Sequence, residues 1–188
     1  CAALLYIAKS FAQAKATGTT FDRTIRFAFF NAEEDAPWSG SGKNFGSGFY
    51  AAGSRAANEN IVAMIAADSL AWNLANNHVT YMVTRKPKLD TNGGDMAIAT
   101  LWQKATTAYG ITSITPLPQQ TGDNLDDHGS FWANGYNAVM FIEDDITQVN
   151  PNWEQLTDRV STAGWHWDYY LSNVQSLVAA AGHLAGIH

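Results

Sequence analysis

The sequence has little cysteine, little charge and no long apolar run, and each shortage excludes a class of protein. Cys1 is the single cysteine among 188 residues, so no disulfide can form within the chain. Charged residues make up 15% of the chain and the net charge is −6, whereas a protein that binds nucleic acid normally needs a basic surface. The most apolar stretch, residues 61–67, has the length of a buried strand and is too short to cross a membrane. We therefore expect neither a nucleic-acid partner nor a membrane span.

The sequence does contain enough apolar residues for one folded domain. Hydrophobic residues account for 46% of the chain, and we find no internal repeat and no linker, so residues 1–188 are expected to form a single domain. Helical periodicity and β-branched or aromatic runs alternate along the chain. The expected helices are 2–16, 47–57, 95–109, 131–134 and 165–187, and the expected strands are 25–30, 61–67, 80–83 and 138–142. This alternation predicts a three-layer α/β/α sandwich with a mostly parallel, mixed sheet.

Two adjacent carboxylates follow the first expected strand. Glu33 and Glu34 come directly after the apolar residues 25–30, at the end of the strand where open α/β sheets place their ligand sites. Neighbouring side chains point in different directions there, so one carboxylate can hold a metal ion while the other handles a proton. A solvated acidic loop is the alternative interpretation of a Glu-Glu pair taken alone.

The segments that follow this acidic pair form a recognisable series. They are Gly46-Ser-Gly-Phe-Tyr50, Glu59-Asn-Ile-Val-Ala-Met-Ile-Ala-Ala-Asp68, Asp126-Asp-His-Gly-Ser-Phe-Trp132 with the strand after it, and Asn150-Pro-Asn-Trp-Glu-Gln-Leu-Thr-Asp158. In this order, and together with the acidic pair, they resemble the zinc aminopeptidases of the M28 family. The resemblance extends over most of the chain and implies the fold of that family.

The resemblance also implies a reaction and a set of site residues. Two zinc ions about 3.5–4 Å apart would clamp a water molecule and the carbonyl of a peptide substrate. Glu33 would be the general base that takes the proton of that water. Glu34 would bind one zinc ion and Asp68 the other, while Asp127 and His128 would shape the pocket. The implied reaction is the removal of N-terminal amino acids from peptides.

Two departures from the family pattern separate this chain from a complete enzyme. The family carries a His and a metal-bridging Asp before its first helix, and this sequence opens directly on residues 2–16, so we expect that the N-terminal portion is lacking. Glu154 stands where the family has a late zinc-binding His. A carboxylate can bind zinc but shifts the preference toward harder metals such as Mg²⁺ and Mn²⁺. The alternative is that Glu154 is a surface residue left after loss of the metal.

Two functional hypotheses follow from these matches and departures. In the first, the chain is the metal-carrying part of an M28-type aminopeptidase. In the second, it is a catalytically inactive module with the same fold that serves in binding, assembly or structure. A lacking N-terminal segment would expose apolar surface, which favours association with another chain or with copies of the same chain. Few lysines and seven tryptophans favour a secreted protein.

Overall fold

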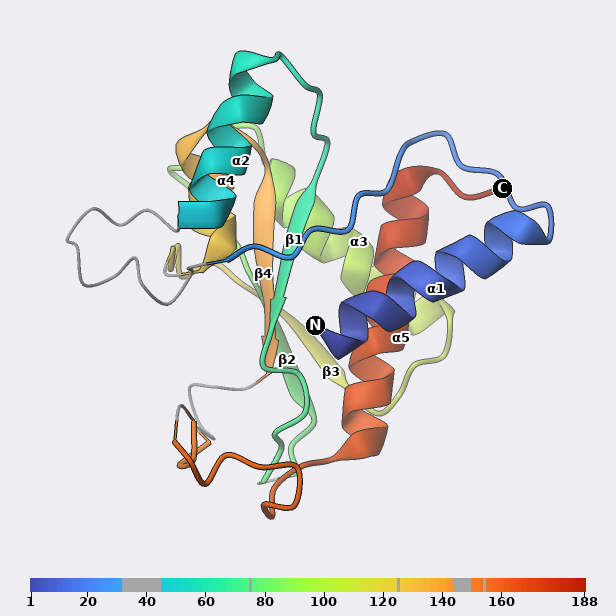
Figure 1. Ribbon diagram of the computed structural model, residues 1–188, viewed down its shortest axis with the longest axis vertical. Helices are drawn as coiled ribbons and strands as arrows, with labels where there is room; N and C mark the ends of the chain where they lie inside the picture. The colour runs from blue at the N-terminus through green and yellow to red at the C-terminus, as the bar shows by residue number, and fades with distance from the viewer. Residues whose placement is uncertain (32–44, 75, 125, 144–149, 154) are drawn as a thin grey trace.

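In the part of the chain that the structure describes, four strands form one mixed sheet with helices on both faces (Figure 1). The computed structural model describes residues 1–31, 45–74, 76–124, 126–143, 150–153 and 155–188. The strands are β1 (Met64–Asp68), β2 (Val79–Val83), β3 (Thr115–Gln119) and β4 (Ala138–Glu143), and their order in the sheet is β1-β4-β2-β3. β1 is parallel to β4 and β2 is parallel to β3, while β2 and β4 are antiparallel. The expected mostly parallel, mixed sheet is confirmed.

Five helices of the described chain form the two outer layers. They are α1 (Ala2–Ala16), α2 (Phe45–Ala56), α3 (Gly94–Ala108), α4 (Asp127–Ala133) and α5 (Trp167–Ala185). α2 and α4 pack together on one face of the sheet, and α1, α3 and α5 cover the other (Figure 1). Side chains alternate between the faces of a strand, so Val139 and Phe141 of β4 enter the core beneath α3 and α5, whereas Ala138 packs against α4. The three-layer prediction is therefore confirmed.

A buried ion pair fixes the start of β4. Asp95 at the beginning of α3 is fully buried, and its carboxylate accepts hydrogen bonds from Arg85 Nε at 2.6 Å and Nη2 at 2.9 Å. The same carboxylate accepts the backbone N–H of Ala138 at 3.0 Å. Its hydrogen bond with Asp95 raises the pKa of Arg85 above the ordinary value, against the effect of burial. A charge removed from water needs such partners, and here they tie α3 to the first residue of β4.

The expected strand over residues 25–30 does not form, and that prediction is wrong. These residues run extended and pass across β1 rather than alongside it (Figure 1). Ile25 and Phe27 pack against the larger core, and Phe30 packs against the cluster under α2 and α4. The composition suits a strand, but no partner strand lies beside this segment in the described part of the chain, and strand propensity needs such a partner.

β3 was not expected, because its sequence contains Pro116 and Pro118. Proline lacks a backbone N–H and is tolerated in edge strands when it faces away from the ladder. β3 is such an edge strand, and its bonds to β2 involve the alternate residues: Thr115 N donates to His78 O at 2.6 Å, and Gln119 O accepts from Thr84 N at 2.8 Å. Both prolines therefore leave the pairing intact.

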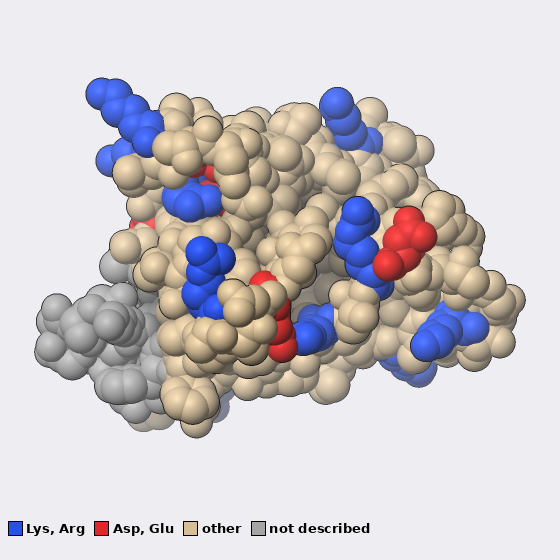
Figure 2. Space-filling model, turned by 90° about the horizontal axis from the view of Figure 1, so that it is seen from above, with Lys and Arg blue, Asp and Glu red and all other residues tan. Residues whose placement is uncertain are grey.

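Charged side chains are scattered over the upper end of the molecule, which Figure 2 shows from above. On this face Lys and Arg stand among uncharged residues with some Asp and Glu between them, and no continuous surface of one sign forms. Among the described residues, no helix combines the length and the hydropathy needed to span a membrane.

Candidate functional site

The site forms at the carboxyl end of β1, where Asp68 is the last residue of the strand. Asp68 is exposed, and it pairs in register with Ile142 of the parallel strand β4. Parallel pairing brings the carboxyl ends of both strands to the same edge of the sheet. Asp68 and Glu143, the last residue of β4, therefore lie at one edge.

The first turn of α4 brings a second carboxylate near Asp68. Asp126 caps this helix by accepting the backbone N–H of Asp127. Burial raises the pKa of Asp127; a hydrogen bond from Ser47 opposes that rise, and the negative charge of Asp68 adds to it. The effect of Asp68 means that the two carboxylates, distant in sequence, lie within electrostatic reach of each other.

His128 is held in the interior behind this carboxylate. It is fully buried, its Nε2 lies 2.6 Å from the carbonyl oxygen of Asp123, and its ring meets the edge of Trp132 at 4.4 Å between centroids. Burial lowers the pKa of His128, so the ring is neutral at pH 7. Since the carbonyl of Asp123 can only accept, the ring proton lies on Nε2. His128 thus fastens α4 to the chain before it, while its predicted role in shaping the pocket stays a prediction.

The Gly-Ser pair at the start of α2 has a steric and a polar function. A Cβ atom on Gly46 would lie 2.7 Å from the backbone oxygen of Asn31, so only glycine allows this close approach. Gly46 N donates to the same oxygen at 3.2 Å. Ser47 is fully buried, and its hydroxyl forms a hydrogen bond with Ser130 Oγ of α4 at 3.1 Å. The pair therefore fixes α2 both to residues 28–31 and to the helix that carries Asp127.

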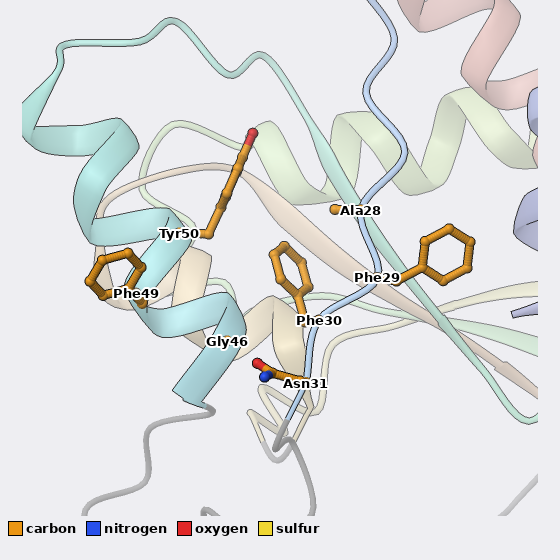
Figure 3. Close-up of a pocket in the computed structure, with 7 residues that line it drawn as sticks. All are labelled: Ala28, Phe29, Phe30, Asn31, Gly46, Phe49 and Tyr50. Carbon is orange, nitrogen blue, oxygen red and sulfur yellow. The ribbon is translucent and has the colours of Figure 1, made fainter.

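An open pocket of about 510 Å³ lies between residues 28–31 and α2 (Figure 3). Phe30 and Tyr50, which both line it, pack against each other with ring centroids 5.5 Å apart, while Phe29 points away from α2. Asn31 lies at its edge, two residues before Glu33. The pocket therefore presents aromatic surface to which an apolar group could bind. In the sequence, the acidic pair follows shortly after residues 28–31.

Three of the predicted site residues, Glu33, Glu34 and Glu154, lie outside the described residues, so their predicted roles stay predictions. The structure places Asp68 and Asp127 within electrostatic reach of each other, with His128 next to Asp127 in α4. Sequence reasoning missed Glu143, a carboxylate that is only 6% exposed at the end of β4. The available signal was a glutamate directly after the apolar residues 138–142.

The model for peptidase family M28 matches residues 1–179. The chain belongs to peptidase family M28. A search of curated proteins gave no match for it. The resemblance expected from the motifs is thus confirmed for the family.

Solved aminopeptidase structures share the fold of this M28 chain. LapA aminopeptidase of Legionella pneumophila has a TM-score of 0.71 and 18% identity, over 98% of this chain and 44% of that one. The aminopeptidase from Aneurinibacillus sp. strain AM-1 has a TM-score of 0.67 and 23% identity, over 98% of this chain and 37% of that one. BSAP, a zinc aminopeptidase from Bacillus subtilis, has a TM-score of 0.74 and 18% identity, over 98% of this chain and 40% of that one. The M28 chain thus spans less than half the length of these structures.

The zinc of this family can be tested against the described residues. Asp68 and Asp127 are oxygen donors of a kind that zinc accepts. Asp127 Oδ1 is screened from solvent and has no hydrogen-bond partner among the described residues, and a cation would satisfy such an atom. Zinc normally needs at least three protein ligands, and no three Asp, Glu, His or Cys side chains gather in the described part of the chain. The described residues therefore fit one side of a zinc site, and the other ligands would come from elsewhere.

A pair of glycine substitutions in α2 tests the close approach at Asn31. Gly46→Ala should lower the free energy of unfolding by about 1–3 kcal/mol, because the added Cβ overlaps the backbone of Asn31. Gly53→Ala in the same helix meets no atom within 4 Å and should raise it by about 0.5–1 kcal/mol. Urea denaturation measures both. Equal effects of the two substitutions would contradict the packing described here.

Substitution of Asp68 tests its proximity to Asp127. In metal-free protein, Asp68→Asn should lower the pKa of Asp127, because a neighbouring negative charge is removed, although burial should keep that pKa above its ordinary value of 3.8. A pH titration of the side-chain carboxyl carbons by ¹³C NMR measures the change. Asp168→Asn, at an exposed carboxylate in the first turn of α5, is the control and should leave the pKa of Asp127 unchanged.

The same raised pKa fixes the sign of a pH effect on stability. Folded Asp127 binds its proton more tightly than the unfolded residue, so its contribution to stability is lost as the pH rises from 3.8 through the folded value. Asp68→Asn should reduce the stability that is lost over this pH range, because it lowers the folded pKa of Asp127. An unchanged titration of Asp127 in this variant would mean that the two carboxylates do not interact.

Proposed function

We propose that this chain provides part of the active site of a metal-dependent aminopeptidase, which releases N-terminal amino acids from peptides. The observation that carries the proposal is the proximity of Asp68 and Asp127 at the carboxyl end of β1, in a chain of family M28. Two carboxylates brought together from distant segments repel each other, and a bound cation relieves that repulsion. Membership of the family supports the nature of the cation and of the reaction.

Glu34 would hold one zinc ion and Asp68 the other, and Glu154 would supply a further carboxylate oxygen where the family pattern has an imidazole. Bound zinc would polarise the scissile carbonyl and lower the pKa of a water molecule. The carboxylate of Glu33 would accept the proton of that water and return it to the nitrogen of the leaving amine. Glu33 would therefore transfer the proton of water to the leaving amine, and Asp68 would bind a zinc ion.

The same acidic surroundings suit the substrate. An aminopeptidase must hold a free α-ammonium group, and a negatively charged site attracts it. Asp127 loses its proton at a higher pH than an ordinary aspartate. We propose that this residue contributes to the negative charge of the site at neutral pH.

We further propose that residues 1–188 belong to one domain. The family match extends over residues 1–179, and the segment after α1 meets the C-terminal end of the chain where Phe21 pairs with Ile187. α1 also packs against α5. No contact in the described part of the chain favours the alternative of a catalytically inactive module.

Replacement of the proposed base tests the function. Glu33→Gln should lower kcat by about 10²–10⁴-fold while the metal content stays unchanged, because the amide cannot accept the proton of water. Turnover of aminoacyl p-nitroanilides by the full chain, with and without a metal chelator, measures this effect.

Glu59→Gln is the matched control for this experiment. Glu59 forms an exposed ion pair with Arg26 at 2.5 Å and has no role in the proposed chemistry, so its replacement should leave kcat unchanged. Normal turnover by Glu33→Gln would remove Glu33 as the base. Failure of the zinc-supplied wild type to hydrolyse any aminoacyl anilide would overturn the proposed function itself.

A further inference from the structure

We infer that Glu143 is a positioning residue for Asp68: it fixes the turn over residues 69–73 that follows Asp68, and thereby the placement of the Asp68 carboxylate. The inference rests on the proposed function, since it gives Asp68 a task that requires accurate placement. Glu143 lies outside every motif that the sequence analysis identified.

Glu143 holds the turn with both its backbone and its side chain. Its backbone N–H donates to the carbonyl oxygen of Ser69 at 2.9 Å, directly after Asp68. Its side-chain Oε2 accepts the backbone N–H of Trp72 at 2.6 Å, three residues further on. One residue of β4 thus binds both ends of the turn, and a short charge-assisted bond is the stronger of the two.

The turn needs such support because its backbone is unusual. Ser69 has a φ of 43°, in the left-handed region that residues other than glycine rarely adopt. A conformation of this kind costs of the order of 1 kcal/mol or more, and it persists only when the surrounding structure imposes it. The bond from Glu143 N–H to the Ser69 carbonyl acts on the strained residue itself.

Other contacts hold the far side of the turn. The amide of Asn173 in α5 donates to Leu70 O at 2.9 Å, and the backbone N–H of His166 donates to Ala71 O at 2.8 Å. These contacts come from α5 and the segment before it. Glu143 is distinct because it approaches from β4, the strand that is paired with Asp68 through Ile142.

A buried carboxylate at position 143 destabilises the folded state unless its hydrogen bonds offset the cost of desolvation. Glu143 is only 6% exposed, and burial of its charge costs desolvation free energy in the folded state. An amide oxygen could accept the same backbone N–H without a charge. We infer that this position requires an acceptor oxygen that reaches the backbone N–H of Trp72, because this bond limits the movement of the turn that follows the metal ligand, and that the charge adds little to this effect. Residues that orient metal ligands typically change metal affinity by about 10–100-fold when they are replaced.

Two conservative variants of Glu143 separate the effect of the length of its side chain from the effect of its charge. Glu143→Gln keeps an acceptor oxygen at the same reach, whereas Glu143→Asp keeps the charge but withdraws the oxygen by one methylene group. The dissociation constant for Zn²⁺, measured on the full chain by competition with a chelating dye, should stay within about threefold of wild type for Gln. It should rise about 10-fold or more for Asp. KM and kcat for an aminoacyl p-nitroanilide are measured alongside, and kcat should fall for Asp more than for Gln.

Ile98→Val is the control for a loss of stability alone. Ile98 is buried in α3 and is not part of the turn, so this change should lower the unfolding temperature and leave the Zn²⁺ dissociation constant unchanged. Wild-type affinity in Glu143→Asp, or a larger loss in Gln than in Asp, would overturn the positioning role while the proposed function stands. Absence of Zn²⁺ binding in the wild type would instead overturn the proposed function and this inference with it.

Discussion

The parallel pairing of β1 with β4 is the constraint on which the described site depends. It places Asp68 beside Ile142, so that the strand ends carrying Asp68 and Glu143 share one edge of the sheet. Parallel strands require a long crossover, and here that crossover contains β2, α3, β3 and α4. The same connection therefore brings Asp127, in the first turn of α4, to the end of β1. The buried pair of Arg85 and Asp95 secures this arrangement at the opposite end of β4, through the bond from Ala138 N to Asp95.

Small side chains set how closely the helices approach the site. Gly46 allows α2 to touch the backbone of Asn31, and Gly129 allows α4 to approach the carbonyl of Asn124, where a Cβ would lie at 2.4 Å. Ser47 and Ser130 join the two helices through a buried hydroxyl pair. The Gly-Ser and Asp-His segments, which sequence comparison treats as motifs, are thus explained by steric contact and hydrogen bonding. Only a few of their residues are available to bind a ligand.

Local sequence predicted the helices well, because each carries its own periodicity. It failed where the structure depends on distant partners. Residues 25–30 have the composition of a strand but cross β1, and β3 forms in spite of two prolines because only its alternate residues bond to β2. In the site, family motifs predicted roles for Asp68 and Asp127, and the structure adds that the two carboxylates lie within electrostatic reach of each other. Glu143 was missed because its partners, Ser69 and Trp72, are identified only by the pairing of two distant strands.

The proposed function requires that Asp68 binds a metal ion. Anomalous diffraction at the zinc absorption edge, from crystals of protein purified without added metal or chelator, tests this directly. We expect an anomalous peak in contact with the carboxylate of Asp68 at the carboxyl end of β1. A zinc-free site in such crystals, or zinc bound away from Asp68, would contradict the proposed function.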